Sequence, residues 1–249
     1  MARIFITGSS DGIGSLTAKR LIAAGHSVVI HARNPQRAAD AAKLCPGAAA
    51  VLVADLTSLD ETRRLAADAN ALGPPFDAVV HNAGLYLGHE RVLGKSGLPS
   101  LFAVNTLAPY TLTCLLDRPK RLVFVTSGMH RSGRARLDDL LPSTYSDSKL
   151  HNVLLAKAFA RRWKDVPSNA VDPGWVPTKM GGASAPDNIE DSVEGFMNLA
   201  LDEGPASGKS GAYFHAIKEG RGSKVADDVA TQDQLLKELE KISGVAVPD

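Results

Sequence analysis

Residues 3–14 read RIFITGSSDGIG, an apolar run followed directly by a glycine-rich turn. The helical pattern of residues 13–24 comes next and closes at Gly25. Gly8, Gly12 and Gly14 therefore lie on a strand-to-helix turn, where the absence of side chains lets a pyrophosphate approach the backbone and the helix N-terminus. A glycine cluster alone can be a tight turn without a ligand. The strand before it and the helix after it favour the phosphate-binding interpretation.

Six more short apolar runs recur along the chain, with amphipathic segments between them. They cover residues 27–31, 50–53, 77–81, 121–126, 169–171 and 212–215. Most lack the polar alternation of a half-exposed strand, so they predict strands buried on both faces. We expect an α/β fold with a doubly wound parallel sheet of about seven strands flanked by helices. Residues 59–70, capped by Ser58, and the apolar residues 98–115 are two of the predicted helices.

Composition narrows the classes of function. The chain has 249 residues, 44% of them hydrophobic and 22% charged, which suits one core, so we predict a single domain over residues 1–249. A net charge of +1 without a long basic block favours small-molecule chemistry over binding to nucleic acid or a membrane. Cys45 and Cys114 have no metal-ligand spacing, so we expect reduced thiols and no metal site. Without a leader-like or long apolar segment, a cytoplasmic location is expected.

Tyr145 and Lys149 are four residues apart in a predicted helix, so their side chains share one face. A cation close to a phenol favours its ionised form and lowers its pKa from about 10, which would let a tyrosine act in acid–base chemistry. The same spacing also occurs in solvated helix pairs. The glycine-rich turn upstream favours the chemical interpretation, a redox enzyme that uses a nicotinamide cofactor.

These residues resemble the short-chain dehydrogenase/reductase family, whose TGxxxGIG signature is matched by Thr7–Gly14, and the likeness extends over nearly the whole chain. The resemblance implies a Rossmann fold and a dinucleotide site. It assigns the cofactor to Gly8, Ser9, Ser10, Gly12, Ile13, Gly14, Arg33, Asp55, Leu56, Asn82, Ala83, Gly84, Tyr145, Lys149, Pro173, Gly174, Val176 and Thr178. For Asn82, a purely structural role in bracing the sheet remains an alternative.

The resemblance also implies a catalytic set of Ser127, Tyr145, Lys149 and Asn105. Ser127 would stabilise the substrate oxygen while Tyr145 exchanges the proton, and Lys149 would bind the nicotinamide ribose. Thr126 is the alternative hydroxyl if the strand register slips by one residue. Asn105 would hold a water that connects Lys149 to solvent; alternatively, it only bends an apolar helix.

The choice of cofactor depends on the end of the second strand. Ala32 stands where a carboxylate would bind the ribose hydroxyls of NAD, and Arg33 could pair with a 2′-phosphate. NADP(H) is therefore preferred, with NAD(H) left open, and Arg33 could also be a plain loop cation. Asp11 points the other way, since NADP-preferring members of the family often carry a basic residue there.

The stretch from Met129 to Ser143 and the Tyr213-Phe214-His215 run look like the retinol-dehydrogenase-like and WW-domain-oxidoreductase-like branch. Loops 85–97, 129–143 and 175–187 should surround the substrate, which places the substrate site in loops that include the C-terminal ones. Apolar residues in them suggest a bulky or aromatic carbonyl substrate. The candidate lining is Leu85, Tyr86, Leu87, Met129, His130, Trp175 and Met180. His130 is expected to bond within its loop rather than to act as a second base.

The leading hypothesis is thus an NADP(H)-dependent carbonyl reductase or alcohol dehydrogenase. A redox sensor or scaffold that binds dinucleotide without catalysis is the alternative, although such proteins usually lose the tyrosine or the lysine. An epimerase or dehydratase is disfavoured because only 100 residues follow Lys149. Family members commonly associate through two long helices that correspond to residues 98–115 and 144–163, so a homodimer or homotetramer is expected.

Overall fold

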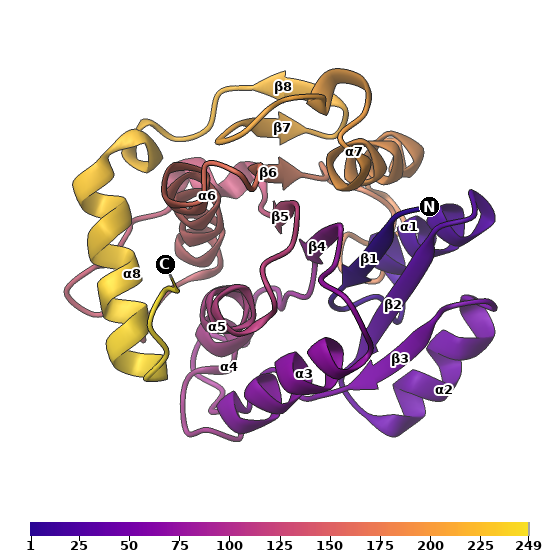
Figure 1. The fold of residues 1–249 in the computed structure, drawn as a ribbon. Helices are drawn as coiled ribbons and strands as arrows, with labels where there is room; N and C mark the ends of the chain where they lie inside the picture. The colour runs from indigo at the N-terminus through magenta and orange to yellow at the C-terminus, as the bar shows by residue number, and fades with distance from the viewer. Residues whose placement is uncertain (249) are drawn as a thin grey trace.

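The computed structural model describes residues 1–248 and forms a single α/β domain around an eight-stranded sheet (Figure 1). The strand order is β3-β2-β1-β4-β5-β6-β7-β8. Their bounds are β1 Arg3–Ile6, β2 Ser27–Ala32, β3 Ala50–Val53, β4 Ala78–His81, β5 Leu122–Val125, β6 Ser168–Asp172, β7 Tyr213–His215 and β8 Lys218–Gly220. The first seven strands pair in parallel, and β8 is antiparallel to β7. The predicted fold class is confirmed.

Helices cover both faces of the sheet. One face carries α1 (Gly12–Ala23), α2 (Pro35–Leu44) and α7 (Ile189–Leu201). The other carries α3 (Leu59–Ala71), α4 (Ser100–Phe102), α5 (Ala108–Leu115), α6 (Tyr145–Arg162) and α8 (Val229–Ser243). Strand β1 shows why the strands read as continuous apolar runs, since Ile4 and Ile6 enter one core and Phe5 enters the other, all fully buried.

Two local predictions differ in outcome. Ser58 caps α3 as expected, its Oγ accepting from the Glu61 backbone N–H at 3.2 Å. The helix expected over residues 98–115 is buried but interrupted: α4 runs into a π-helical turn over Ala103–Leu107 before α5 begins. Strand β8 was not expected, because Lys218–Gly220 is short and exposed and has no apolar pattern.

Helix α8 covers the two helices that the sequence predicts as an association surface. It packs along α6 and reaches α5, and the segment after it continues across them (Figure 1). Tyr110 Oη donates to the Val245 carbonyl at 2.7 Å, and Trp163 Nε1 donates to the Pro248 carbonyl at 3.2 Å. Arg161 of α6 pairs with Asp233 of α8. The outer side of α5 and α6 is therefore occupied by the chain's own C-terminal region.

Within residues 1–248, no helix combines the length and the apolar character needed to cross a bilayer. In the same part of the chain, no group of three or more His, Cys, Asp or Glu side chains is arranged to hold a metal ion.

Candidate active site

The glycine-rich turn is shaped by two glycines that allow close contact. Gly8 has a φ of +62°, and a Cβ there would lie 2.6 Å from the Ala83 Cα. A Cβ on Gly14 would lie 2.4 Å from Asn82 Nδ2 and 3.0 Å from the Gly8 carbonyl oxygen. No real Cβ tolerates such distances, so the turn can pack against the end of β4 only without side chains. A backbone cradle at the start of α1 results, as the sequence predicts.

The Asn82-Ala83-Gly84 motif, which follows β4, fixes this turn through hydrogen bonds. Asn82 Nδ2 donates to the carbonyl oxygens of Thr7 and Gly8, both at 2.9 Å. The Ala83 backbone N–H donates to Thr7 Oγ1 at 3.1 Å. Asn82 thus has the structural role that the sequence left as an alternative, and it fixes the cradle rather than pointing away from it.

His31 is a residue of this region that the sequence analysis did not single out. Its Nδ1 accepts from the Gly8 N–H at 3.0 Å, and its Nε2 donates to the Ala54 carbonyl at 2.9 Å. Only the neutral tautomer protonated on Nε2 makes both bonds. Burial lowers the pKa of His31 to about 4, which keeps it neutral. A polar side chain at the end of a buried apolar strand was the available signal, because it needs partners.

Ser9 completes the same network. Its Oγ donates to the Ile6 carbonyl at 2.8 Å and accepts from the His31 N–H at 2.9 Å. Ile13 packs on the apolar core that lies under α1. Both residues therefore support the cradle from the inside.

Cations surround the outer edge of the turn. Arg37, in the first turns of α2, pairs with Asp11 and donates to Ser10 Oγ at 3.2 Å, and Lys179 Nζ lies 3.2 Å from Asp11. Partial burial raises the pKa of Asp11, but hydrogen bonds from Arg37 and Lys179 outweigh that effect and lower it overall. Arg33 is exposed just after β2. The acidic Asp11 is thus neutralised by two cations that the sequence analysis had not considered.

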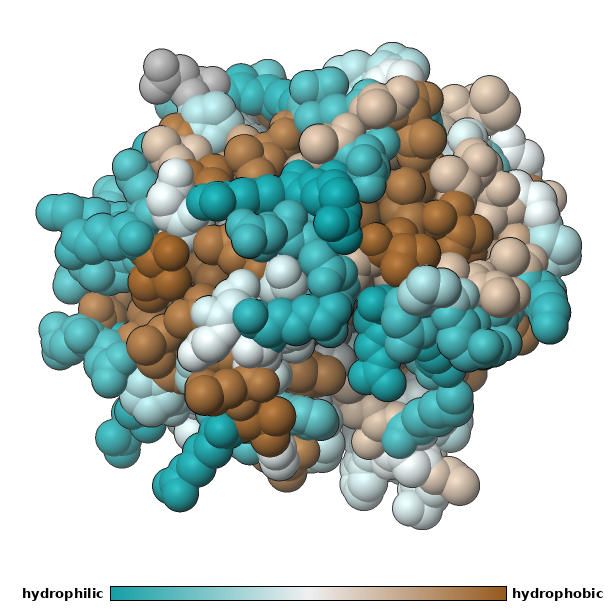
Figure 2. Space-filling view, turned by 90° about the horizontal axis from the view of Figure 1, so that it is seen from below, coloured by the Kyte–Doolittle hydropathy of each residue, from teal (hydrophilic) through white to brown (hydrophobic). Residues whose placement is uncertain are grey.

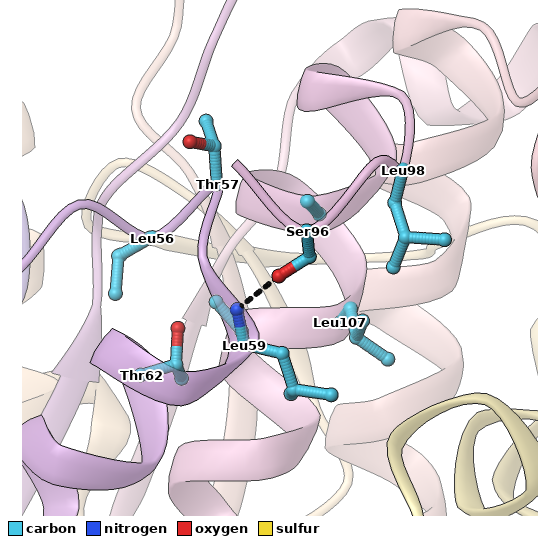
Figure 3. Close-up of a pocket in the computed structure, with 9 residues that line it drawn as sticks. Leu56, Thr57, Leu59, Thr62, Ser96, Leu98 and Leu107 are labelled. Carbon is cyan, nitrogen blue, oxygen red and sulfur yellow. Dashed lines mark hydrogen bonds between the residues drawn. The ribbon is translucent and has the colours of Figure 1, made fainter. Parts of the chain in front are cut away.

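Asp55 and Leu56 follow β3. Asp55 Oδ1 accepts from Thr57 N and Oγ1 at 3.0 and 2.7 Å, and Lys95 lies 3.4 Å from Oδ2. Partial burial raises the pKa of Asp55, yet the Thr57 and Lys95 contacts lower it overall. Leu56 turns into a small recess, where Ser96 Oγ accepts from the Leu59 N–H at 2.6 Å (Figure 3). None of the catalytic candidates lines this recess.

The segment after β6 reaches back to the glycine turn. Gly174 has a φ of +83° and donates its N–H to Asp172 Oδ1 at 2.9 Å. A Cβ on Gly12 would lie 3.8 Å from Thr178 Cγ2, so the segment and the turn are in contact. The Pro173 carbonyl accepts from Ser192 Oγ of α7 at 2.6 Å, and Val176 is buried. These contacts place the predicted cofactor segment against the cradle.

Ser127, Tyr145 and Lys149 come together at the carboxyl end of β5. The Ser127 and Tyr145 hydroxyls share a hydrogen bond, and Lys149 Nζ lies 5.6 Å from the centre of the Tyr145 ring. Burial raises the pKa of Tyr145 to about 12, against the smaller lowering effect of the Ser127 bond. Burial likewise lowers the pKa of Lys149 to about 8, opposed by the charge of Asp172.

The predicted lowering of the Tyr145 pKa by Lys149 is therefore not found. Burial disfavours the charged form of both groups, and it is the largest effect on each. In this environment Tyr145 is protonated at neutral pH. A protonated phenol in this position has a proton to donate.

Asp172, the last residue of β6, is a buried carboxylate that the sequence analysis did not assign. Its Oδ2 accepts from Tyr213 Oη at 3.0 Å and from His215 Nδ1 at 3.2 Å. Burial, followed by the charge of Asp172, raises the pKa of Tyr213 to about 12. The Tyr213-Phe214-His215 run noted in the sequence thus supports the carboxylate that faces Lys149.

Asn105 lies in the π-helical turn and is fully buried. Its Oδ1 accepts from the Leu85 N–H at 2.7 Å, and its Nδ2 donates to the Leu85 carbonyl and to Ser148 Oγ, both at 3.0 Å. Its side chain therefore braces the loop after β4 and joins it to α6. A role in relaying protons to Lys149 stays a prediction.

Two alternatives from the sequence are decided by hydrogen bonds. Thr126 Oγ1 is buried and donates to the Lys149 carbonyl at 2.7 Å, so Ser127 is the hydroxyl that meets Tyr145. His130 Nδ1 lies 2.6 Å from the Ser127 carbonyl, and its Nε2 accepts from the Ser223 N–H at 3.0 Å. His130 thus bonds within its loop through Nδ1, as expected, and also to the distant Ser223 through Nε2, and it is buried rather than lining a pocket.

The remaining residues of the predicted apolar lining lie in loops around this cluster. The Tyr86 ring meets the Tyr145 ring edge-on, with 4.8 Å between centroids. Met129 donates its N–H to Ser127 Oγ at 3.3 Å. Trp175 is 57% exposed, and Leu87 and Met180 are exposed as well, whereas Leu85 is partly buried against the core. The mouth of the site is therefore apolar and open to solvent.

Comparison with known proteins agrees with this geometry. The model of the short chain dehydrogenase family matches residues 2–189. An uncharacterized oxidoreductase of Emericella nidulans is 47% identical over all of this chain and 99% of its own. Retinol dehydrogenase 14 of Mus musculus is 31% identical, covering 96% of this chain and 81% of its own length. A crystal structure of an uncharacterized protein from Mycobacterium paratuberculosis has a TM-score of 0.82 at 25% identity, over 100% of this chain and 96% of that one.

Proposed function

Because the chain belongs to the short-chain dehydrogenase family of oxidoreductases, we propose that it interconverts a ketone or aldehyde with an alcohol by hydride transfer to and from NADP(H). One contact pattern carries this proposal. The end of β4 packs on the glycine turn at Ala83, while a Cβ on the next residue, Gly84, would lie 3.5 Å from Lys149 Nζ. The dinucleotide cradle and the catalytic cluster are therefore adjacent across a single tripeptide.

The cradle fits a nicotinamide dinucleotide, because the missing side chains of Gly8 and Gly14 let the turn pack directly on Ala83 and Asn82 and present its backbone at the start of α1. When bound, this cofactor supplies or accepts the hydride. Its pyrophosphate would lie on the turn, its adenine near Asp55 and Leu56, and its nicotinamide end near Lys149. The segment with Pro173, Gly174, Val176 and Thr178 would cover it from the side of α7.

The protein's own groups handle the proton. Ser127 would hydrogen-bond the substrate oxygen, and Tyr145 would donate its phenolic proton to that oxygen during reduction and accept one during oxidation. The positive charge of Lys149 stabilises the phenolate that remains. We propose that Asn105, whose Oδ1 lies beside Gly84 as Lys149 Nζ does, belongs to the path by which the proton is replaced.

Three cations support the preference for NADP(H). Arg33 follows β2 and is exposed, and Arg37 and Lys179 offset the charge of Asp11 in the glycine turn. A planar guanidinium next to a phosphate makes strong, charge-assisted hydrogen bonds. Arg33 is therefore proposed to distinguish NADPH from NADH.

The substrate is proposed to be a bulky apolar or aromatic carbonyl compound. The argument rests on the apolar residues at the mouth, above all Tyr86 against Tyr145 and the exposed indole of Trp175. Binding is favourable when a flat apolar ligand covers an aromatic surface that was exposed to water. A cytoplasmic location is part of the same proposal.

The homodimer or homotetramer that the sequence led us to expect stays a proposal, and it would have to pair through a surface other than the outer side of α5 and α6. The side of α5 and α6 through which relatives would pair is covered by α8. On the face seen in Figure 2, apolar side chains form patches that hydrophilic side chains interrupt. Light scattering during size-exclusion chromatography measures the mass in solution, and one chain has a mass of 26.2 kDa. Twice that mass would show a dimer that forms through a surface other than α5 and α6.

The function is tested by titrating the protein with NADPH and NADH and then assaying a panel of aryl ketones, quinones and aldehydes. Tyr145→Phe should keep its affinity for the cofactor and lose on the order of 10³-fold in kcat. Tight cofactor binding by the wild type without turnover of any carbonyl would favour a redox sensor, and unchanged turnover in Tyr145→Phe would refute the assigned proton donor.

A further inference from the structure

Two side chains of α6 share one backbone oxygen. The Val125 carbonyl, at the end of β5, accepts from Lys149 Nζ at 3.0 Å and from Asn152 Nδ2 at 3.1 Å. Lys149 and Asn152 are three residues apart, so they lie on one face of the helix. All three residues are buried, Asn152 with 2% of its surface exposed. A carbonyl oxygen has two lone pairs, and here two donors use them.

The orientation of the Asn152 amide follows from this contact. A carbonyl oxygen can only accept, so the NH₂ group must face Val125. Asn152 Oδ1 is left buried without a hydrogen-bond partner among the described residues. An unpaired buried oxygen costs folding free energy that a leucine of similar volume would not cost. Stability alone therefore does not explain an asparagine at this position, whereas its donor group has a defined target.

We propose that Asn152 is a positioning residue for Lys149. By occupying one lone pair of the Val125 carbonyl, its amide leaves the ammonium a single direction of approach and keeps it over the Tyr145 ring. Without the amide, Lys149 could rotate toward the second lone pair and away from the phenol. The inference rests on the proposed function, because it assumes that the position of Lys149 matters for the proton transfer.

The charged and titratable groups around Lys149 are few. Tyr145 faces it from its own helix, and Asp172 faces it from the end of β6. Farther out, Tyr86 contacts Tyr145, while His130, Arg131, Tyr213 and His215 surround Asp172. A carboxylate introduced at position 152 would thus be a second acidic group beside the ammonium, and the titration of Lys149 should report it.

Three variants separate positioning from packing. Asn152→Leu removes the amide and keeps the volume, and Asn152→Asp replaces the amide with a carboxylate. Val153→Ala is the matched control, because Val153 is the next residue of α6 and fully buried but does not bond to Val125. Melting temperature measures the structural effect of each. The Cε signal of ¹³C-labelled lysine, followed against pH and assigned with Lys149→Arg, reports Lys149 without any cofactor or turnover.

We expect Asn152→Leu to fold and to lose about tenfold in kcat with little change in KM, since the reacting groups are misplaced rather than the substrate lost. In Asn152→Asp the pKa of Lys149 should rise by about one unit or more. Val153→Ala should lower the melting temperature and leave the titration of Lys149 unchanged.

An unshifted Lys149 signal in Asn152→Asp, or a folded Asn152→Leu with the kcat of the wild type, would overturn the proposal. If the wild type reduces no carbonyl compound, the proposed function fails, while the Lys149 titration still decides whether the side chain at position 152 lies beside the ammonium. If the wild type is active and both variants match it, only the positioning role fails.

Discussion

The glycine turn and the mouth of the site lie at the same edge of the sheet, but they are built differently. In the turn, the polar groups of Thr7, Ser9 and His31 bond to the backbone at fixed distances. At the mouth, Trp175, Leu87 and Met180 expose apolar surface to solvent. A phosphate requires donors held in place before it binds, whereas an apolar substrate requires only a surface that can be covered.

This difference predicts which positions of the chain tolerate substitution. A side chain added in the turn meets backbone, as at Gly8 beside Ala83, while the mouth has open space around Gly88 and Gly182. Loops held by few contacts open at low free-energy cost and tolerate substitution. We therefore expect changes in the turn to have large effects on the cofactor and changes at the mouth to have small effects on the substrate.

The strongest test of this contrast is a pair of glycine substitutions. Gly8→Ala should weaken dinucleotide binding by roughly a hundredfold, because the new Cβ would clash with the Ala83 backbone at a positive φ. Gly182→Ala is the control, since its φ is also positive, at +79°, but no atom lies within 4 Å of its Cβ position. Equal losses of NADPH affinity in a fluorescence titration would mean that backbone strain, and not close packing, explains the turn.

Acid should destabilise the core that supports the turn before it affects the mouth, because the core holds buried neutral histidines. Burial lowers the pKa of His31 and His151 to about 4 and that of His81 to about 3, below the unfolded value of about 6.5. Between the folded and the unfolded pKa values, the unfolded chain binds more protons than the folded one. The free energy of unfolding therefore rises with pH in this range and decreases as the pH falls from 6.5 toward 4. The loss should be about 3 kcal/mol for each of these histidines, measured in urea titrations.

His31→Gln should flatten this pH dependence, because one of the buried titrating histidines is removed. His89→Gln, at an exposed loop position, is the control and should leave the curve unchanged. A curve for His31→Gln that is parallel to that of the wild type would show that His31 is not the neutral partner of the Gly8 N–H.

A smaller effect is expected at the edge of the turn. Arg33→Ala should raise the Kd for NADPH about tenfold and leave that for NADH nearly unchanged, since one charge-assisted contact is lost. Arg91→Ala, in an exposed loop after β4, controls for the general loss of a positive charge. Equal weakening of both cofactors would assign Arg33 to the loop rather than to the 2′-phosphate, and Arg37→Ala would then be the next variant to titrate.

The smallest effect should come from the mouth. Trp175→Ala should lower kcat/KM for an aryl ketone by about threefold to tenfold through KM, because the exposed indole contributes apolar contact and no proton chemistry. The Kd for NADPH should not change. A loss in kcat of the size expected for Tyr145→Phe would show that the mouth takes part in orienting the reacting groups, and the contrast between the two regions would fail.

The strands and the glycine turn could be predicted because their signals are local. Strand β3 has the predicted bounds, and Ser58 caps α3 through its own hydroxyl. Strand β8 could not be predicted, since Lys218–Gly220 is exposed and gains its identity only by pairing with β7. The π-helical turn at Asn105 was missed as well, and the Asn105 side chain finds its partners in the Leu85 backbone, 20 residues away.

For the site, local motifs named the residues, and packing decided their states. The spacing of Tyr145 and Lys149 predicts their proximity, but burial determines that the pKa of Tyr145 rises to about 12 and that of Lys149 falls to about 8. His31, Arg37 and Asp172 belong to the site through partners far along the chain, at Ala54, Asp11 and Tyr213. Such pairs leave no pattern in a single sequence.

By itself, the sequence determined the family, the parallel sheet and the glycine turn, and it predicted Ser127, Tyr145 and Lys149 as site residues, because each signal is a local motif. Only the tertiary structure decided that α8 covers α5 and α6, that His31 locks the cradle, and that Asn152 and Lys149 share the Val125 carbonyl. The physical reason is that burial and hydrogen-bond partners are set by segments that meet only in the folded chain, and these set charge state and direction.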